Sequence, residues 1–220
     1  MFLGHFGAGF AAKRWAPRVS LGVLFIAAQF IDLLWPSLLL LGVERVSIAP
    51  GITAVTPLDF EHYPVSHSLL AVVGWSVLVG GAGYALRRSL PEAFVLALLV
   101  LSHWFLDVLV HRPDLPLAPF GDARVGLGLW NWVAATLLVE GTIFLGGVWL
   151  YARATRARDA AGRWGLWGLV ALLLVIQAAN LLGSAPPNVA AIAWVGQAQW
   201  LLVLWAFWLD RHREAAPAWA

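Results

Sequence analysis

The sequence predicts an all-α, polytopic membrane protein, a helical bundle of about six transmembrane helices preceded by a short N-terminal helix. Hydrophobic residues make up 61% of the 220 residues and charged residues only 12%, which lies outside the range of ordinary soluble domains. The 14 Trp and 21 Gly fit this class, because indole rings favour the membrane interface and glycines let transmembrane helices approach closely. Without a recognisable linker, internal repeat or low-complexity tract, the chain is predicted to form one domain over residues 1–220.

Six apolar segments are each long enough to cross a bilayer as a helix, which takes about 20 residues. Charged or Pro/Gly-rich breaks separate them, and they cover roughly residues 19–41, 67–86, 92–110, 129–151, 164–182 and 189–209. A shorter apolar segment, residues 2–12, precedes Lys13 and Arg14. It is too short to span, and its charges follow the apolar run instead of preceding it as in a signal peptide. We expect a re-entrant or half-depth helix there.

Positive charge predicts the orientation, because cytoplasmic loops carry the excess of Lys and Arg. Of the 14 basic residues, 11 fall in segments predicted on the same side as both termini, and the opposite loops hold only Arg45, Arg112 and Arg124. Both termini are therefore predicted to be cytoplasmic. This topology accounts for the basic residues, so we expect no nucleic-acid partner.

The absence of cysteine restricts any metal site to imidazole and carboxylate ligands. Four of the six histidines, His62, His67, His103 and His111, map to the outer ends of the second and third predicted spans or to the loops beside them. One side of the membrane should hold all four.

The third span carries the most informative pattern, in which His103, Asp107 and His111 recur every four residues. Residues four apart share a helix face, so each adjacent pair can chelate one ion. His103 and His111 lie about 12 Å apart along an ideal helix, which makes Asp107 the natural bridge if two ions bind. The alternative is an interfacial helix end with solvated polar groups.

Other polar residues can join this site. Asp32 lies inside the first span, where a carboxylate costs roughly 2.5–3.5 kcal/mol that a metal ion, a buried hydrogen bond or protonation must offset. His5 would lie about 12 Å deep if the short N-terminal helix climbs into the membrane, which allows it to approach Asp32. His62 and His67 stand five residues apart across a helix start, where Pro64 and Ser66 fit the turn and the N-cap. Glu140, in the middle of the fourth span, is predicted to have a structural or supporting role.

The ordered set of these motifs resembles the YdjM-like membrane-bound metal-dependent hydrolase family, also described as LexA-binding inner-membrane hydrolases. Gly4-His5 resembles the family's N-terminal Gly-His, and Asp32 stands where the family has paired acids. The segment from His62 to Ser68 resembles its His-x-Gly-x-Thr-His-Ser, with Pro64 for glycine and Ser66 for threonine, and Ser102-His103-x-x-x-Asp107 resembles its Ser-His-x-x-x-Asp. No residues of this chain match a LexA contact.

A fainter similarity, through the His103-x-x-x-Asp107 step followed by His111, is to zinc-dependent phospholipase C and the P1-type nucleases, which implies phosphoester chemistry.

Together the residues and the resemblance predict a membrane-embedded, metal-dependent hydrolase. Its cofactor is expected to be a divalent ion of the zinc type, one or two per chain, and its substrate an ester or phosphoester of a lipid or lipid-linked molecule at the non-cytoplasmic face. A carboxylate, Asp32 or Glu61, would accept the proton from water. The expected metal ligands are His5, Asp32, His62, His67, His103, Asp107 and His111.

Two other functional classes stay open. An ion or proton transporter also places ionisable residues inside the membrane, although it needs them through the whole thickness, and this chain offers only Glu140 and some amides elsewhere. A metal-stabilised protein without catalysis would fill every coordination position with protein ligands. An open position separates the enzyme from this last class.

Overall fold

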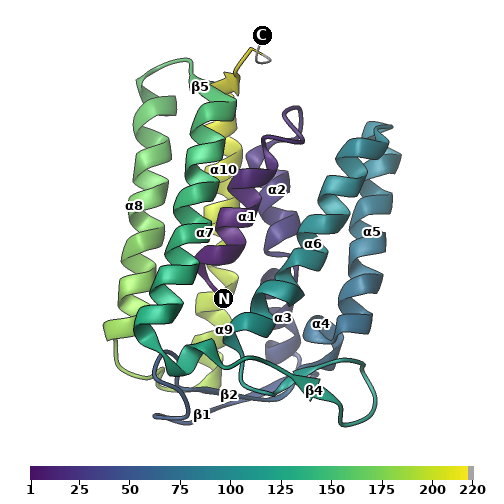
Figure 1. The fold of residues 1–220 in the computed structure, drawn as a ribbon, viewed down its shortest axis with the longest axis vertical. Helices are drawn as coiled ribbons and strands as arrows, with labels where there is room; N and C mark the ends of the chain where they lie inside the picture. The colour runs from purple at the N-terminus through teal and green to yellow at the C-terminus, as the bar shows by residue number, and fades with distance from the viewer. Residues whose placement is uncertain (218–220) are drawn as a thin grey trace.

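The protein is a helical bundle in the computed structural model, which describes residues 1–217 (Figure 1). Within these residues, five helical segments are long and apolar enough to cross a membrane, and a sixth is bent. The five are α5 (Leu69–Arg87), α6 (Leu90–Val110), α7 (Val133–Ala154), α8 (Ala160–Leu182) and the pair α9 (Val189–Gln197) with α10 (Gln199–Arg211). The predicted class, an all-α polytopic membrane bundle, is confirmed.

The first predicted span, residues 19–41, is broken in two, which the apolar pattern does not reveal. Helix α2 (Leu21–Ala28) and helix α3 (Phe30–Leu40) meet at Gln29 with a bend of 59°. Proline is not the cause, since Pro36 lies within α3 and not at the break. At the break, the carbonyl oxygen of Ala28 accepts a hydrogen bond from the ring of His103 on α6. The interruption is therefore tied to a contact between helices that are far apart in the sequence.

Helix α1 (Leu3–Ala12) is the short N-terminal helix that the sequence predicts. It begins near the middle of the bundle, where Figure 1 places the N-terminus, and its far end leads into the loop at the same end as the C-terminus. It packs on α7, α2 and α6, and Phe6 and Phe10 are fully buried. A Cβ built on Gly147 of α7 would overlap the carbonyl oxygen of Gly7, so these two glycines let the backbones of α1 and α7 touch.

Buried apolar side chains form two clusters that hold the helices together. One joins α1, α2 and α6 through residues such as Leu24, Val100 and Trp104. The other joins α1, α7, α8 and α10 and contains Phe144 and Leu169. Many apolar side chains on the long helices face outward instead, as lipid-facing positions require.

Short pairs of antiparallel strands close both ends of the bundle, and the apolar pattern does not predict them. At one end, β1 (Arg45–Ile48) pairs with β2 (Leu58–His62), and β3 (Leu115–Pro116) pairs with β4 (Arg124–Val125); at the other, β5 (Thr155–Ala157) pairs with β6 (Arg213–Ala215) (Figure 1). The single helical turn α4 (Pro64–His67) and the 3-10 turn η1 (Leu129–Asn131) complete the first end. The fourth span consequently begins at Val133, later than predicted.

Candidate metal centre

A cluster of imidazoles and carboxylates lies at the end of the bundle that β1 and β2 cover. It draws side chains from four helices: His5 on α1, Asp32 on α3, His67 on α4, and His103 with Asp107 on α6. Two overlapping groups each keep their ligand atoms within 4.8 Å of one another: His5, His103 and Asp107 form one, and Asp32, His67 and His103 form the other. The five residues that the sequence spreads over a hundred positions therefore meet.

Two imidazole nitrogens of this cluster lie close to two carboxylate oxygens. The Nε2 atom of His103 lies 3.2 Å from Oδ2 of Asp107 and 3.6 Å from Oδ1 of Asp32. The Nε2 atom of His67 lies 3.6 Å from the same Asp32 oxygen and 3.9 Å from the same Asp107 oxygen. Tetrahedral ligands at zinc distances stand about 3.3–3.6 Å apart, and these four nitrogen–oxygen distances lie close to that range.

One hydrogen bond shows that Nδ1 of His103 carries a proton. Its Nδ1 lies 2.9 Å from the carbonyl oxygen of Ala28, which can only accept, so Nδ1 carries the proton. In the neutral ring, Nε2 then presents a lone pair toward the two carboxylates. The broken first span is what supplies this carbonyl, and it also sets Asp32 in the first turn of α3.

A relay through Ser66 fixes the tautomer of His67 in the same way. The Ser66 hydroxyl lies 2.6 Å from Oε2 of Glu44, a carboxylate oxygen that accepts, and 2.7 Å from Nδ1 of His67. The hydroxyl therefore donates to Glu44 and accepts from the Nδ1–H of His67. The other oxygen of Glu44 accepts the backbone N–H groups of Val65 and Ser66, which anchors the relay. Carboxylate partners of this kind orient metal-ligating histidines.

The Nε2 atoms of His67 and His103 show whether the site suits a cation. With both Nδ1 atoms protonated, the Nε2 atoms of the neutral His67 and His103 rings turn lone pairs toward carboxylate oxygens that also carry lone pairs. His103 Nε2 is buried and has no hydrogen-bond partner among the described residues. These lone pairs repel one another, and a divalent cation among them would turn that repulsion into favourable contacts. The residues present therefore suit a zinc-type ion.

Access to the cluster differs from one member to the next. The side chain of Asp32 is 24% exposed, whereas those of His67, His103 and Asp107 are 4%, 0% and 2% exposed. Asp32 thus marks the side from which a substrate or water can approach.

His5 meets the opposite oxygen of Asp107. Its Nε2 lies 3.0 Å from Oδ1 of Asp107, and its ring stacks on His103 with the centroids 3.6 Å apart. The α-amino group of Met1 lies 2.6 Å from the same Oδ1. His5 therefore holds Asp107 in position, and its second ring nitrogen, Nδ1, is buried without a hydrogen-bond partner in the described chain.

Glu140, for which a structural or supporting role is predicted, caps the start of α1. Its Oε2 accepts the backbone N–H groups of Phe2 at 3.1 Å and Leu3 at 2.9 Å. A carboxylate at a helix N-terminus satisfies donors that have no partner within the helix and interacts favourably with the helix dipole. Glu140 thereby fixes the depth of α1, and with it the position of His5.

His111 lies beside the cluster but outside both groups of ligand atoms. Its Nδ1 is 3.0 Å from Oδ1 of Asp114, which also accepts the Tyr63 hydroxyl at 3.1 Å, and its ring centroid is 6.5 Å from that of His67. Burial lowers the pKa of His111 below its ordinary value despite the neighbouring Asp114, so the ring is neutral at neutral pH. His111 supports the wall of the site.

His62 and Glu61 do not join the cluster. Both lie at the exposed end of β2, where His62 pairs in register with Arg45 of β1. The five-residue step between His62 and His67 spans the turn into α4, so the two side chains diverge. Ser66 also differs from expectation, because the N-cap of α5 is Ser68 and the Ser66 hydroxyl serves the relay instead.

Two residues that support the site were missed in the sequence. Glu44 is 2% exposed although it stands in a loop, and no pattern around it points to His67. Ser66 stands next to a histidine, but that adjacency fitted a helix cap equally well.

The fold and this cluster define a class: a multi-pass helical membrane protein with a buried His/Asp centre at one end of its bundle. A family model described as YdjM inner membrane protein matches residues 2–184, and the chain belongs to that family. No curated protein and no solved structure matches the chain significantly. The family supports a location in an inner membrane.

Proposed function

We propose that the protein is a membrane-embedded, metal-dependent hydrolase that holds one zinc-type ion on His67, His103 and Asp107 and leaves the fourth coordination position, beside Asp32, open for water. The observation that carries the proposal is that the Nε2 atoms of His67 and His103 each lie 3.2–3.9 Å from carboxylate oxygens of Asp32 and Asp107, of which Asp32 is accessible. When bound, such an ion polarises an ester or phosphoester and lowers the pKa of water toward neutrality.

The chain's own residues then have distinct tasks. Asp32 is the accessible carboxylate, so its free oxygen accepts the proton as a water oxygen bonds to the carbonyl carbon or phosphorus of the substrate. The bond from that atom to the ester oxygen breaks, and the leaving oxygen takes up a proton. His5 and the Glu44–Ser66 relay are positioning residues that orient Asp107 and His67. Glu61, exposed on β2, has no role here.

The depth of the site favours a lipid or lipid-linked substrate. His103 and Asp107 stand in the last two turns of α6, close to the end of the bundle that the hairpins β1–β2 and β3–β4 cover (Figure 1). A membrane span of this length ends at about the level of the lipid head groups. An ester bond between a head group and its hydrophobic anchor would stand at this level.

The transporter alternative has less support. Its polar groups would have to continue through the bundle, yet Glu140 is engaged with the start of α1, and Lys13 at the far end is paired with Asp210 at 3.1 Å. A metal-stabilised protein without catalysis remains the competing interpretation, and turnover separates it from the enzyme.

Metal analysis and hydrolysis should be measured on the same detergent-purified samples. Elemental analysis of the wild-type protein is expected to give about one zinc-type ion per chain, the stoichiometry of a single tetrahedral site. Hydrolysis of bis(p-nitrophenyl) phosphate and p-nitrophenyl esters should depend on that ion. His103→Ala should lose the ion and slow hydrolysis about 100-fold or more, because it removes several kcal/mol of transition-state stabilisation.

The matched control is His212→Ala, since His212 pairs with Asp159 at the opposite end of the bundle. It should keep both the metal and the activity. Wild-type protein with bound metal and no turnover would favour the metal-stabilised class, and metal-free protein would refute the proposed centre.

We propose that the site faces the non-cytoplasmic side and that the C-terminus is cytoplasmic, because the arginine-rich segments lie at the other end. The chain contains no cysteine, so single cysteines can be placed without removing others. In intact cells, a membrane-impermeant maleimide should label Asp122→Cys and not Ala160→Cys, which are both exposed and lie at opposite ends. Labelling of Ala160→Cys alone would reverse the orientation.

A further inference from the structure

Two cavities adjoin each other between α7 and α8, and they differ sharply in chemistry. The polar one encloses about 280 Å³ beside the β1–β2 hairpin, and the apolar one encloses about 640 Å³ between the two helices. Glu140, Gln177 and Leu181 line both. The two cavities are therefore neighbours, one forming a polar end and the other an apolar end of the same region between the helices.

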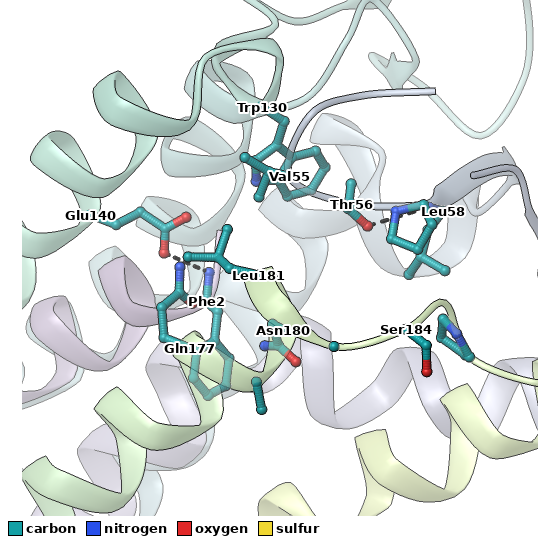
Figure 2. Close-up of a pocket in the computed structure, with 14 residues that line it drawn as sticks. Phe2, Val55, Thr56, Leu58, Trp130, Glu140, Gln177, Asn180, Leu181 and Ser184 are labelled. Carbon is teal, nitrogen blue, oxygen red and sulfur yellow. Dashed lines mark hydrogen bonds between the residues drawn. The ribbon is translucent and has the colours of Figure 1, made fainter. Parts of the chain in front are cut away.

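The polar end gathers hydrogen-bonding side chains from separate parts of the chain. Figure 2 shows Glu140 of α7 with Gln177 and Asn180 of α8 on one side, and Thr56 with Leu58 across from them. Gln177 is only 6% exposed, and among the described residues its amide has no hydrogen-bond partner. Gln177 lines the cavity, so a ligand group placed there can pair with this amide.

The apolar end has the surroundings of an acyl chain. Its walls are Leu137 and Gly141 of α7 with Leu174 and Leu182 of α8, and the leucines are 42–87% exposed on the lipid-facing side. A Cβ built on Gly141 would meet no atom within 4 Å, so this glycine leaves room between the helices.

We propose that these cavities form one lipid-binding site, with an acyl chain between α7 and α8 and an uncharged, hydroxyl-bearing polar end at Glu140 and Gln177. Charge selects this class of lipid. None of the described residues that line the polar end is Lys, Arg or His, and Glu140 contributes a carboxylate. A phosphate placed there would be buried without a cation, whereas hydroxyl groups can donate to the carboxylate and to the amide oxygen.

The lipid site adjoins the candidate metal centre. Phe2 lines the polar end and donates its N–H to Glu140, while the α-amino group of the preceding Met1 contacts Asp107. We further infer that the bound lipid is the hydrophobic part of the substrate, and this point rests on the proposed function. Because a phosphate does not suit the polar end, the scissile bond of such a substrate would be a carboxylic ester that lies toward Asp32 and Asp107.

Photolabelling in proteoliposomes tests the site directly. The probe is diacylglycerol with a diazirine in one acyl chain, compared with phosphatidic acid that has the same chains. Mass spectrometry should locate diacylglycerol labels on α7 and α8 of the wild-type protein. Phosphatidic acid should label about tenfold less, because its phosphate would be buried without a cation.

Gly141→Leu fills the apolar end and should reduce diacylglycerol labelling about tenfold, the effect of a steric misfit in an apolar pocket. Gly146→Leu is the matched control on the same helix, because a Cβ on Gly146 also meets no atom within 4 Å and this residue lines neither cavity. It should label as the wild type does. Gln177→Leu removes the amide that would pair with the lipid hydroxyl. It should therefore reduce the excess of diacylglycerol labelling over phosphatidic acid labelling.

Equal labelling of Gly141→Leu and the wild type, or labels confined to other helices, would overturn the lipid site. Equal labelling by both probes would overturn the uncharged polar end. Metal content measured on the same samples keeps the two proposals apart: labelling at α7 and α8 in metal-free protein would uphold the lipid site and overturn its role in hydrolysis.

Discussion

Asp107→Asn is expected to abolish metal binding, the largest single effect that we predict. The carboxylate of Asp107 contacts both His103 and His5, and it lies 3.9 Å from His67. The amide keeps the shape of the side chain but removes the charge that offsets the ion's desolvation. The affinity for zinc should fall by more than about 100-fold, beyond the loss seen when only an outer partner of a ligand is removed.

Thermal unfolding with and without a chelator measures this loss independently of activity. Removing the ion from the wild-type protein should lower Tm by about 5 °C or more, since bound metal stabilises only the folded state. Asp107→Asn should show no response to the chelator. Glu92→Gln is the control, because Glu92 stands at the other end of α6 and pairs with Arg87 at 2.6 Å. A chelator response in Asp107→Asn equal to that of the wild type would exclude Asp107 as a ligand.

Gly147→Ala is expected to have the largest effect on stability. The added Cβ would overlap the backbone of Gly7, and Gly7 itself faces the carbonyl oxygen of Ile143. Neither backbone can move aside as a flexible side chain can, so α1 must shift away from α7. Overpacking of this kind costs about 1–3 kcal/mol, and here it should also displace His5 from Asp107.

The comparison with Gly146→Ala isolates this contact. Gly146 is the neighbouring residue, and its Cβ would stand in open space, so the change there removes glycine without a clash. Fluorescence-detected size-exclusion chromatography after a heat challenge should show a lower Tm for Gly147→Ala only. If both variants unfold at the wild-type temperature, the close approach of α1 and α7 is not needed for stability.

The class of fold could be read from the sequence because lipid imposes its own pattern. A span must carry about 20 apolar residues and satisfy its backbone internally, so α5, α6 and α8 match the predicted segments closely. The break at Gln29 could not be predicted in this way, since both halves of the first span are equally apolar. The short strand pairs at the ends could not be predicted either, because their strands are only two to five residues long.

The candidate site was predicted in part. The four-residue step placed His103 and Asp107 on one face, and the cost of a carboxylate in the membrane singled out Asp32. Sequence spacing failed for His62, because a step across a turn does not say which way the next side chain points. Glu44 was not found at all, since its partner Ser66 lies 22 residues away and the pairing exists only after β1 and β2 close the end of the bundle.

By itself, the sequence determined that this chain is a helical membrane protein with imidazoles and carboxylates near one end of its spans, because hydropathy and helical periodicity act over short distances along the chain. Only the tertiary structure decided which of those groups meet. Their meeting depends on the 59° bend between α2 and α3, on the Gly7–Gly147 contact and on the cap that Glu140 places on α1. Each of these is set by packing between residues far apart in sequence, which no local pattern encodes.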